Sequence, residues 1–175
     1  LPFRLGGIAG PFGVGKTLAV LDLIVMLKQG GVPKEQLLVF DTHGSVEPYV
    51  MLERYRDQFE LQVTVEAQNQ LRVFEKWLVE EKQERFLTVI DTIEPLQDAL
   101  VSKVWDDPSL SAAYKEKAGG LMWGRVKKDF LHLLLRMLKK TQTLLVTIHT
   151  RKEWVAGKPT SRIESKFLEP VYTLS

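Results

Sequence analysis

The segment 10–17, with the sequence GPFGVGKT, constrains this chain more than any other part of it. It fits the pattern G-x-x-x-x-G-K-[ST], a phosphate-binding loop that joins a strand to a helix. A short apolar segment, 5–9, precedes the loop, and a long apolar run, 18–27, follows it. Because this context is present on both sides, the sequence predicts a polyphosphate site, and not a glycine-rich turn that matches by chance.

The chemistry of such a loop depends on its backbone. Glycines permit left-handed dihedral angles and let several N–H groups approach the anion closely. The helix that follows presents further free N–H groups and the positive end of its dipole. We expect Lys16 to neutralise the β- and γ-phosphates and Thr17 Oγ1 to bind Mg²⁺. The predicted nucleotide-binding residues are Gly10, Pro11, Phe12, Gly13, Val14, Gly15, Lys16, Thr17 and Leu18.

Composition and charge narrow the class of protein further. The 175 residues are expected to form a single domain, 1–175, and the first residue, Leu1, suggests a trimmed piece of a longer chain. Lys and Arg number 24 and Asp and Glu 22, so contact with DNA would need a local basic patch. The absence of cysteine excludes disulfides and thiolate metal sites. No apolar run reaches membrane-spanning length, so we expect a cytoplasmic protein.

Apolar segments alternate with helical patterns along the chain. Strands are predicted at 5–9, 37–41, 61–65, 86–91, 143–149 and 171–174, and a hairpin or loop at 151–163. Helices are predicted at 17–28, 48–58, 94–105, 111–118 and 121–140, with a further helix capped by Asn69. The alternation predicts an α/β fold with a doubly wound, mostly parallel sheet and helices on both faces. The first helix is apolar nearly all round, so we expect it to be buried on several sides.

Two of the predicted strands end in residues that suit phosphate chemistry. Strand 86–91 ends in Asp91, about 75 residues after Lys16, where a carboxylate can bind Mg²⁺, usually through water. Thr92 follows it, so the acidic pair that many ATPases use as metal ligand and water activator is missing here. Strand 143–149 ends in His149, which can reach the γ-phosphate or its attacking water; the alternative is a strand end without such a role.

These motifs together resemble the RecA-like ATPase core, and most closely the single-domain AAA-type nucleotide-binding proteins of phages and bacteria. Some members of that group, the Sak4-like proteins, are implicated in single-strand annealing and recombination. The similarity rests on the loop 10–17, the corner 40–49, the segment 63–78, Asp91 with Thr92, and the strand that ends in His149. It implies a RecA-like P-loop NTPase that hydrolyses ATP with Mg²⁺ in the cytoplasm of a bacterial or phage-infected cell. It also implies assembly into rings or filaments with ATP at the subunit interfaces.

The resemblance implies roles for single residues, with one departure from the family pattern. Lys16 and Thr17 would handle phosphate and metal, Asp91 would support the metal, and His149 would sense the γ-phosphate. At the corner after strand 37–41 the family has a Glu that polarises the attacking water, and this sequence has His43.

Three interpretations of that corner remain open. A neutral imidazole at His43 could orient the water. Alternatively, Glu47 could reach in from the next helix. His43 could also be an ordinary polar loop residue, which puts efficient hydrolysis in doubt.

The sequence leaves several functions to be distinguished. The first is an ATPase that drives a DNA transaction and grips single-stranded DNA through the segments 105–124 and 151–162. Aromatic residues lie among cationic ones in these segments, a mixture that suits base stacking: Trp105, Tyr114, Trp123 and Trp154. The same aromatics could instead close a small subdomain or a subunit interface. The second function is an ATP-controlled switch or scaffold that acts through protein partners. The third is a small-molecule kinase, against which stands the lack of an evident arginine-rich lid in this sequence.

Overall fold

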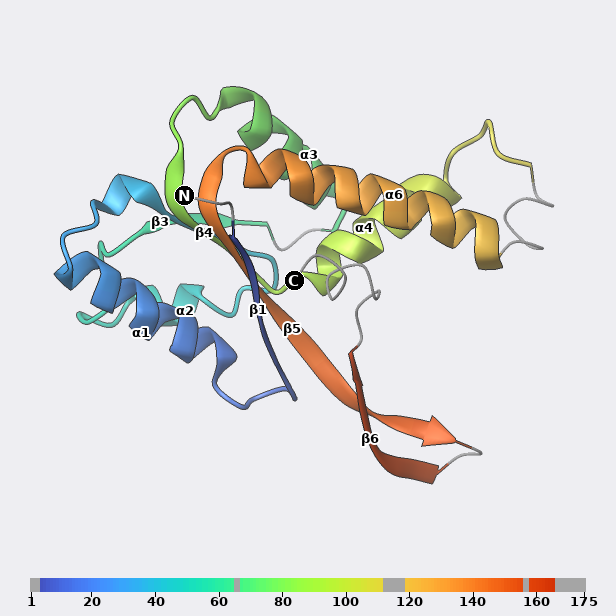
Figure 1. The fold of residues 1–175 in the computed structure, drawn as a ribbon, viewed down its shortest axis with the longest axis horizontal. Helices are drawn as coiled ribbons and strands as arrows, with labels where there is room; N and C mark the ends of the chain where they lie inside the picture. The colour runs from blue at the N-terminus through green and yellow to red at the C-terminus, as the bar shows by residue number, and fades with distance from the viewer. Residues whose placement is uncertain (1–3, 65–66, 112–118, 156–157, 166–175) are drawn as a thin grey trace.

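The computed structural model describes residues 4–64, 67–111, 119–155 and 158–165 of the chain, drawn as a ribbon in Figure 1. Its strands are β1 (Arg4–Gly10), β2 (Leu37–Asp41), β3 (Glu60–Val63), β4 (Arg85–Asp91), β5 (Thr141–Val155) and β6 (Lys158–Ser165). Its helices are α1 (Lys16–Gln29), α2 (Glu47–Val50), α3 (Ala67–Glu80), α4 (Glu94–Trp105) and α6 (Gly119–Leu138), with a short 3-10 helix, η1 (Lys34–Gln36). Strands alternate with helices, as the apolar segments predicted.

Five of the strands form a parallel sheet in the order β1-β5-β4-β2-β3, and β6 pairs with β5 in the antiparallel direction. All of β2 and the last five residues of β4 are buried, as expected for apolar strands that are covered on both faces. The register places Gly10 beside His149 and Asp41 beside Asp91. The polar strand ends therefore meet at one edge of the sheet, and the predicted α/β fold with a mostly parallel sheet is confirmed.

Helices cover both faces of this sheet (Figure 1). One hydrophobic cluster joins the sheet to α3, α4 and α6 and includes the fully buried Phe130. A second cluster joins the sheet to α1 and to the segment after β2, and includes the fully buried Ile24. Successive side chains of a strand point to opposite faces of the sheet. Leu38 and Phe40 of β2 therefore belong to the first cluster and Val39 to the second.

The first helix is less buried than its composition predicted. Val20, Leu21 and Ile24 are buried against the sheet, whereas Leu18 is 39% exposed and Met26 is 67% exposed. The expectation of burial on several sides was wrong, because α1 crosses one face of the sheet and no described element covers its outer side. The apolar content of a helix therefore did not reveal how many of its sides are packed.

Two further helix predictions were wrong in their bounds. The helix predicted at 48–58 is only α2 (Glu47–Val50), and turns follow it. These turns bury Tyr55 and Phe59 in the second cluster, so packing outweighs helix propensity in this segment. The helix predicted to be capped by Asn69 begins at Ala67, which places Asn69 inside its first turn.

The long strand β5 runs beyond the sheet and turns back as β6, so the predicted hairpin is confirmed. Figure 1 shows this hairpin standing away from the body of the molecule. Most of the helix predicted at 111–118, and all of the strand predicted at 171–174, lie outside the described residues. None of the helices in the described part of the chain is long and apolar enough to cross a membrane.

Candidate functional site

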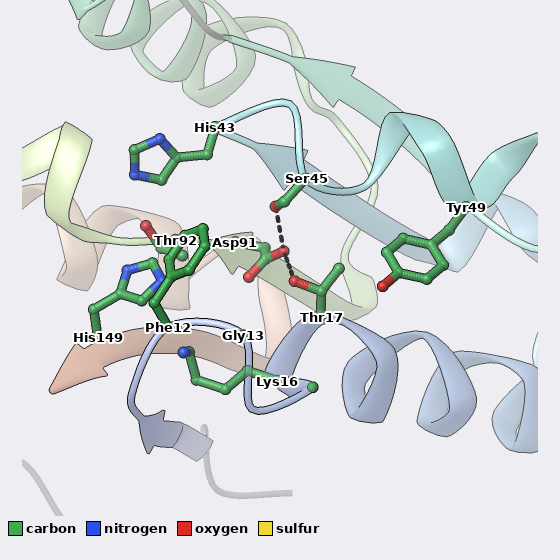
Figure 2. A pocket seen from close by; sticks show the side chains of 11 residues that line it. Phe12, Gly13, Lys16, Thr17, His43, Ser45, Tyr49, Asp91, Thr92 and His149 are labelled. Atoms are coloured by element: carbon green, nitrogen blue, oxygen red, sulfur yellow. Dashed lines mark hydrogen bonds between the residues drawn. The ribbon is translucent and has the colours of Figure 1, made fainter.

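A cavity of about 420 Å³ lies at the edge of the sheet where the polar strand ends meet. Figure 2 shows the side chains that surround it, which come from the loop 10–17, the corner after β2, the end of β4 and β5. Its lining residues are Phe12, Gly13, Gly15, Lys16, Thr17, His43, Ser45, Tyr49, Asp91, Thr92 and His149. The volume falls within the range of roughly 300–1,000 Å³ that small-molecule sites occupy.

The loop 10–17 has the backbone conformation that its glycines predicted. Gly13 and Gly15 have φ angles of 76° and 90°, in the left-handed region where an L side chain is strained. The N-cap of α1 is Gly15, which has no side chain that could accept a hydrogen bond from the first N–H groups of the helix. The first N–H groups of α1 are therefore available to an anion in the cavity.

Lys16 is buried and turns its ammonium group onto the loop itself. Its Nζ donates to the carbonyl oxygens of Gly10 and Pro11, each at 2.9 Å. Burial lowers the pKa of Lys16 below its usual value, whereas the negative charges of Glu94 and Asp91 oppose this shift. The ammonium is therefore desolvated and held at the wall of the cavity, where a phosphate could replace the two carbonyl partners.

The carboxylate of Asp91 accepts hydrogen bonds from three hydroxyl groups. Its Oδ2 accepts hydrogen bonds from Thr17 Oγ1 at 2.7 Å and from Ser45 Oγ at 2.9 Å. Its Oδ1 accepts a hydrogen bond from Thr147 Oγ1. Figure 2 shows the bonds from Thr17 and Ser45 meeting on the carboxylate. The sequence predicted that Thr17 and Asp91 lie together and that Thr147 is one of the polar residues at the end of its strand, but it gave no role to Ser45 and did not place Thr147 beside Asp91.

This arrangement suits the magnesium ion that the fold implies. Mg²⁺ prefers oxygen ligands and is bound in such sites by one or two protein groups together with phosphates and water. Thr17 Oγ1 and the Asp91 carboxylate offer that kind of oxygen and lie 2.7 Å apart. Among the described residues no cluster of three or more His, Cys, Asp or Glu side chains could hold a metal by itself. The donor set therefore fits Mg²⁺ that arrives with a nucleotide.

The corner after β2 is held by Asp41. This carboxylate is fully buried and accepts hydrogen bonds from the backbone N–H groups of four residues that follow it: His43, Ser45, Val46 and Glu47. Next to it, the hydroxyl of Thr42 donates to the carbonyl oxygen of Thr92 at 2.6 Å and accepts its N–H at 2.8 Å. The peptide bond between Asp91 and Thr92 is cis. These contacts join the end of β4 to the corner.

The two candidates for a water-orienting residue at this corner differ in their position. His43 lines the cavity, although its residue as a whole is exposed. Glu47 is exposed at the start of α2, and it does not belong to the described set of lining residues. The structure therefore places His43, and not Glu47, at the wall of the site.

His149, on β5, also lines the cavity. Its side chain is 13% exposed, and its ring stacks on the exposed ring of Phe12 with the centroids 5.5 Å apart. The ring of His43 lies edge-on to it at 6.1 Å. Burial lowers the pKa of His149 below its usual value of 6.5; Glu94 opposes this shift and Lys16 adds to it.

Glu94 is an acidic residue beside the site that sequence reasoning missed. Its Oε1 accepts the backbone N–H of His149, and its Oε2 lies 3.5 Å from Nδ1 of the same ring. A second acid was expected directly after Asp91, where Thr92 stands, or at the corner after β2, where Glu47 was the candidate. The available signal was that Glu94 is the first residue of the helix that leaves the end of β4.

The segments proposed to contact DNA are only partly described. Trp105 is 49% exposed at the end of α4. Trp123 is partly buried against the first hydrophobic cluster, so it packs as a core residue. The side chain of Trp154, in the hairpin, and the residue Tyr114 lie outside what the structure describes.

The fold and the site together define an α/β domain whose parallel sheet carries a P-loop sequence at the edge that borders the cavity. The chain belongs to the AAA domain family, whose model matches residues 5–173. Among solved structures it is similar to the crystal structure of the RadB recombinase, with a TM-score of 0.53 and 18% sequence identity, over 93% of this chain and 67% of that chain. At this identity the likeness shows the fold alone. No curated protein sequence matches the chain.

Proposed function

We propose that this protein is a Mg²⁺-dependent ATPase of the RecA-like class. The observation that carries the proposal is the convergence of Lys16, Thr17 and Asp91 on one cavity, beside a loop in which Gly13 and Gly15 have left-handed backbone conformations. A triphosphate needs a cation, several N–H donors and a metal-binding hydroxyl, and these groups supply all three.

The residues around the cavity have separate roles in this reaction. The N–H groups of the loop and of the first turn of α1 bind the phosphates, and Lys16 exchanges its two carbonyl partners for phosphate oxygens. Thr17 Oγ1 and Asp91 would hold Mg²⁺, which supplies charge neutralisation for the phosphates. The rings of Phe12 and Tyr49, which line the cavity, provide apolar surface for the rest of the nucleotide.

The ATPase assignment is tested by binding and turnover with the variant Lys16→Ala. A charged hydrogen bond contributes about 1.5–3 kcal/mol, so the affinity for ATP with Mg²⁺ should fall about 10- to 100-fold. Lys28→Ala, in the last turn of the same helix, is the matched control and should leave the affinity unchanged. Absence of affinity for any purine triphosphate in the wild-type protein would overturn the proposal.

We also propose that the protein assembles into a ring or filament in the cytoplasm and acts in recombination, single-strand annealing or a related DNA transaction. The projecting β5–β6 hairpin and the exposed Trp105 are the features that support contact with single-stranded DNA. The exposed apolar residues of α1, such as Met26, support contact between subunits. Turnover that rises when single-stranded DNA is added would support this part of the proposal, and turnover that does not respond to DNA would count against it.

A second candidate function is an ATP-controlled switch or scaffold with little hydrolysis. It is favoured by one observation, that Asp91 is the only carboxylate among the described lining residues and is already bound by three hydroxyl groups. The corner that holds a catalytic Glu in the family carries His43 here. Tight binding of ATP with negligible turnover, with or without DNA, would favour this second function.

A further inference from the structure

Glu94 and His149 form an acid–imidazole pair beside the cavity. Glu94 begins α4 and His149 lies on β5, where its ring lines the cavity next to Phe12. One carboxylate oxygen, Oε1, binds the backbone N–H of His149, and the other, Oε2, lies 3.5 Å from Nδ1 of its ring. Because Glu94 contacts both the backbone and the ring, the orientation of the imidazole depends on this carboxylate.

The second carboxylate oxygen of Glu94 faces the ring nitrogen Nδ1 of His149. Oε2 of Glu94 is buried and has no hydrogen-bond partner among the described residues. A buried carboxylate oxygen without a donor is costly, and an Nδ1–H group on His149 is the donor within reach. A proton on Nδ1 would face this unpartnered oxygen, 3.5 Å away, and would leave Nε2 with a lone pair that can accept a hydrogen bond.

We propose that Glu94 is a positioning residue that keeps His149 in its Nδ1–H form, so that Nε2 accepts a hydrogen bond from the water that attacks the γ-phosphate. This inference rests on the proposed ATPase function. It gives His149 a different role from that of a γ-phosphate sensor, because phosphate oxygens need a donor, whereas a water O–H needs an acceptor.

Of the two residues, His149 and not Glu94 is placed to bind the attacking water. Oε1 of Glu94 is occupied by a backbone N–H and Oε2 is buried, whereas the ring of His149 lines the cavity. His149 orients the water but keeps its own covalent structure. The water oxygen forms the new bond to phosphorus, the bond from phosphorus to the bridging oxygen of ADP breaks, one water proton stays on the released phosphate and the other passes to solvent.

The tautomer of His149 can be observed directly by NMR of the imidazole nitrogens. The chain has three histidines, and the signals of His149 are those that disappear in His149→Gln. The wild-type protein should carry the proton on Nδ1. In Glu94→Gln the amide oxygen can still accept the backbone N–H of His149, while the amide N–H₂ faces Nδ1, so the proton should move to Nε2.

The same variants separate this role from nucleotide binding. Glu94→Gln should lower kcat for ATP at least about tenfold, as expected when a positioned acceptor is removed. Its affinity for ATP should stay within about threefold of wild type, because Lys16 and Thr17 are unchanged. Asp106→Asn removes an exposed carboxylate at the other end of α4 and is the control. It should change neither the tautomer nor kcat.

The outcomes distinguish this inference from the function on which it rests. A wild-type proton on Nε2, or a tautomer that Glu94→Gln does not change, would overturn the inference whatever the turnover. A tautomer that moves without a loss of kcat would also overturn the catalytic role. If the tautomer moves but the wild-type protein binds ATP without hydrolysing it, the Glu94–His149 pair is supported and the ATPase function is refuted.

Discussion

At the level of single residues, the orientation of Asp91 depends on three hydroxyl groups, and one of them can be removed at little structural cost. Ser45 is partly exposed, and its Oγ shares Oδ2 of Asp91 with Thr17. In Ser45→Ala we expect the affinity for ATP with Mg²⁺ to fall about 2- to 10-fold, the value of one hydrogen bond. Affinity measured by calorimetry with EDTA should stay unchanged, as should both affinities in the control Ser102→Ala, on the exposed side of α4. An equal loss with and without Mg²⁺ would mean that Ser45 acts on the loop and not through Asp91.

His149 makes the stability of the protein depend on pH in a defined direction. Burial lowers its pKa in the folded state below 6.5, so in the window between the two pKa values the folded chain binds fewer protons than the unfolded chain. The free energy of unfolding therefore rises with pH through this window and, as far as His149 is concerned, is constant above it. The charged and titratable groups that act on the ring are Glu94, Lys16 and His43.

Urea unfolding between about pH 5 and 7 measures this contribution. The difference in free energy between wild type and His149→Gln should increase with pH below 6.5, because Gln has no proton to lose. A difference that decreases with pH would mean that the folded state stabilises the charged imidazole, contrary to the effect of burial.

The residues of the site differ in how well the sequence alone could predict them. Lys16 and Thr17 follow from a loop pattern, and Asp91 follows from an apolar strand that ends in a carboxylate at a suitable distance along the chain. Ser45 and Glu94 could not be predicted in this way. Their positions depend on how the corner after β2 and the start of α4 pack beside other strands, and no spacing along the chain encodes that packing.

At the level of elements, the corner after β2 is organised by the buried carboxylate of Asp41. Its two oxygens accept four backbone N–H groups, which fixes the path of the segment that carries His43 and Ser45 into the site. Asp41→Asn keeps the shape but replaces one acceptor oxygen by a donor, which faces N–H groups. We expect the free energy of unfolding to fall by about 1–3 kcal/mol and the affinity for ATP to decrease. Asp57→Asn, at an exposed turn that Asn also tolerates, is the control for chemical unfolding.

The helices and strands were predicted best where both the spacing of apolar residues and the length of the segment were clear in the sequence. The helix predicted at 94–105 has the same bounds in the structure, and β2 and β4 match their apolar runs closely. The helix predicted at 48–58 failed because Pro48 marks a helix start but nothing local marks its end. The chain instead leaves α2 after Val50, since Tyr55 and Phe59 must reach the core before β3 begins.

At the level of the whole molecule, the order of the strands creates the site. β5 lies between β1 and β4, which brings His149 beside Gly10 and places Thr147 against Asp91. The alternation of strands and helices predicted a parallel sheet but not this order, because crossover connections of similar length allow several orders. The position of β5 also explains why the hairpin leaves the molecule from the same edge of the sheet as the cavity.

This placement leads to a prediction about nucleic acid that belongs to the whole molecule. If the hairpin binds single-stranded DNA, the affinity should fall steeply with salt. In Arg151→Ala combined with Arg162→Ala, the slope of log K against log salt concentration should become shallower by about 0.7 for each phosphate that the variant no longer neutralises. The control is Lys139→Ala, which removes one exposed cation two residues before β5 and is compared with half of the effect of the double variant. Fluorescence anisotropy over a range of salt concentrations measures both slopes. A flat salt response of the wild type, or effects of the same size per removed charge in the hairpin and control variants, would remove the hairpin from the DNA-binding surface.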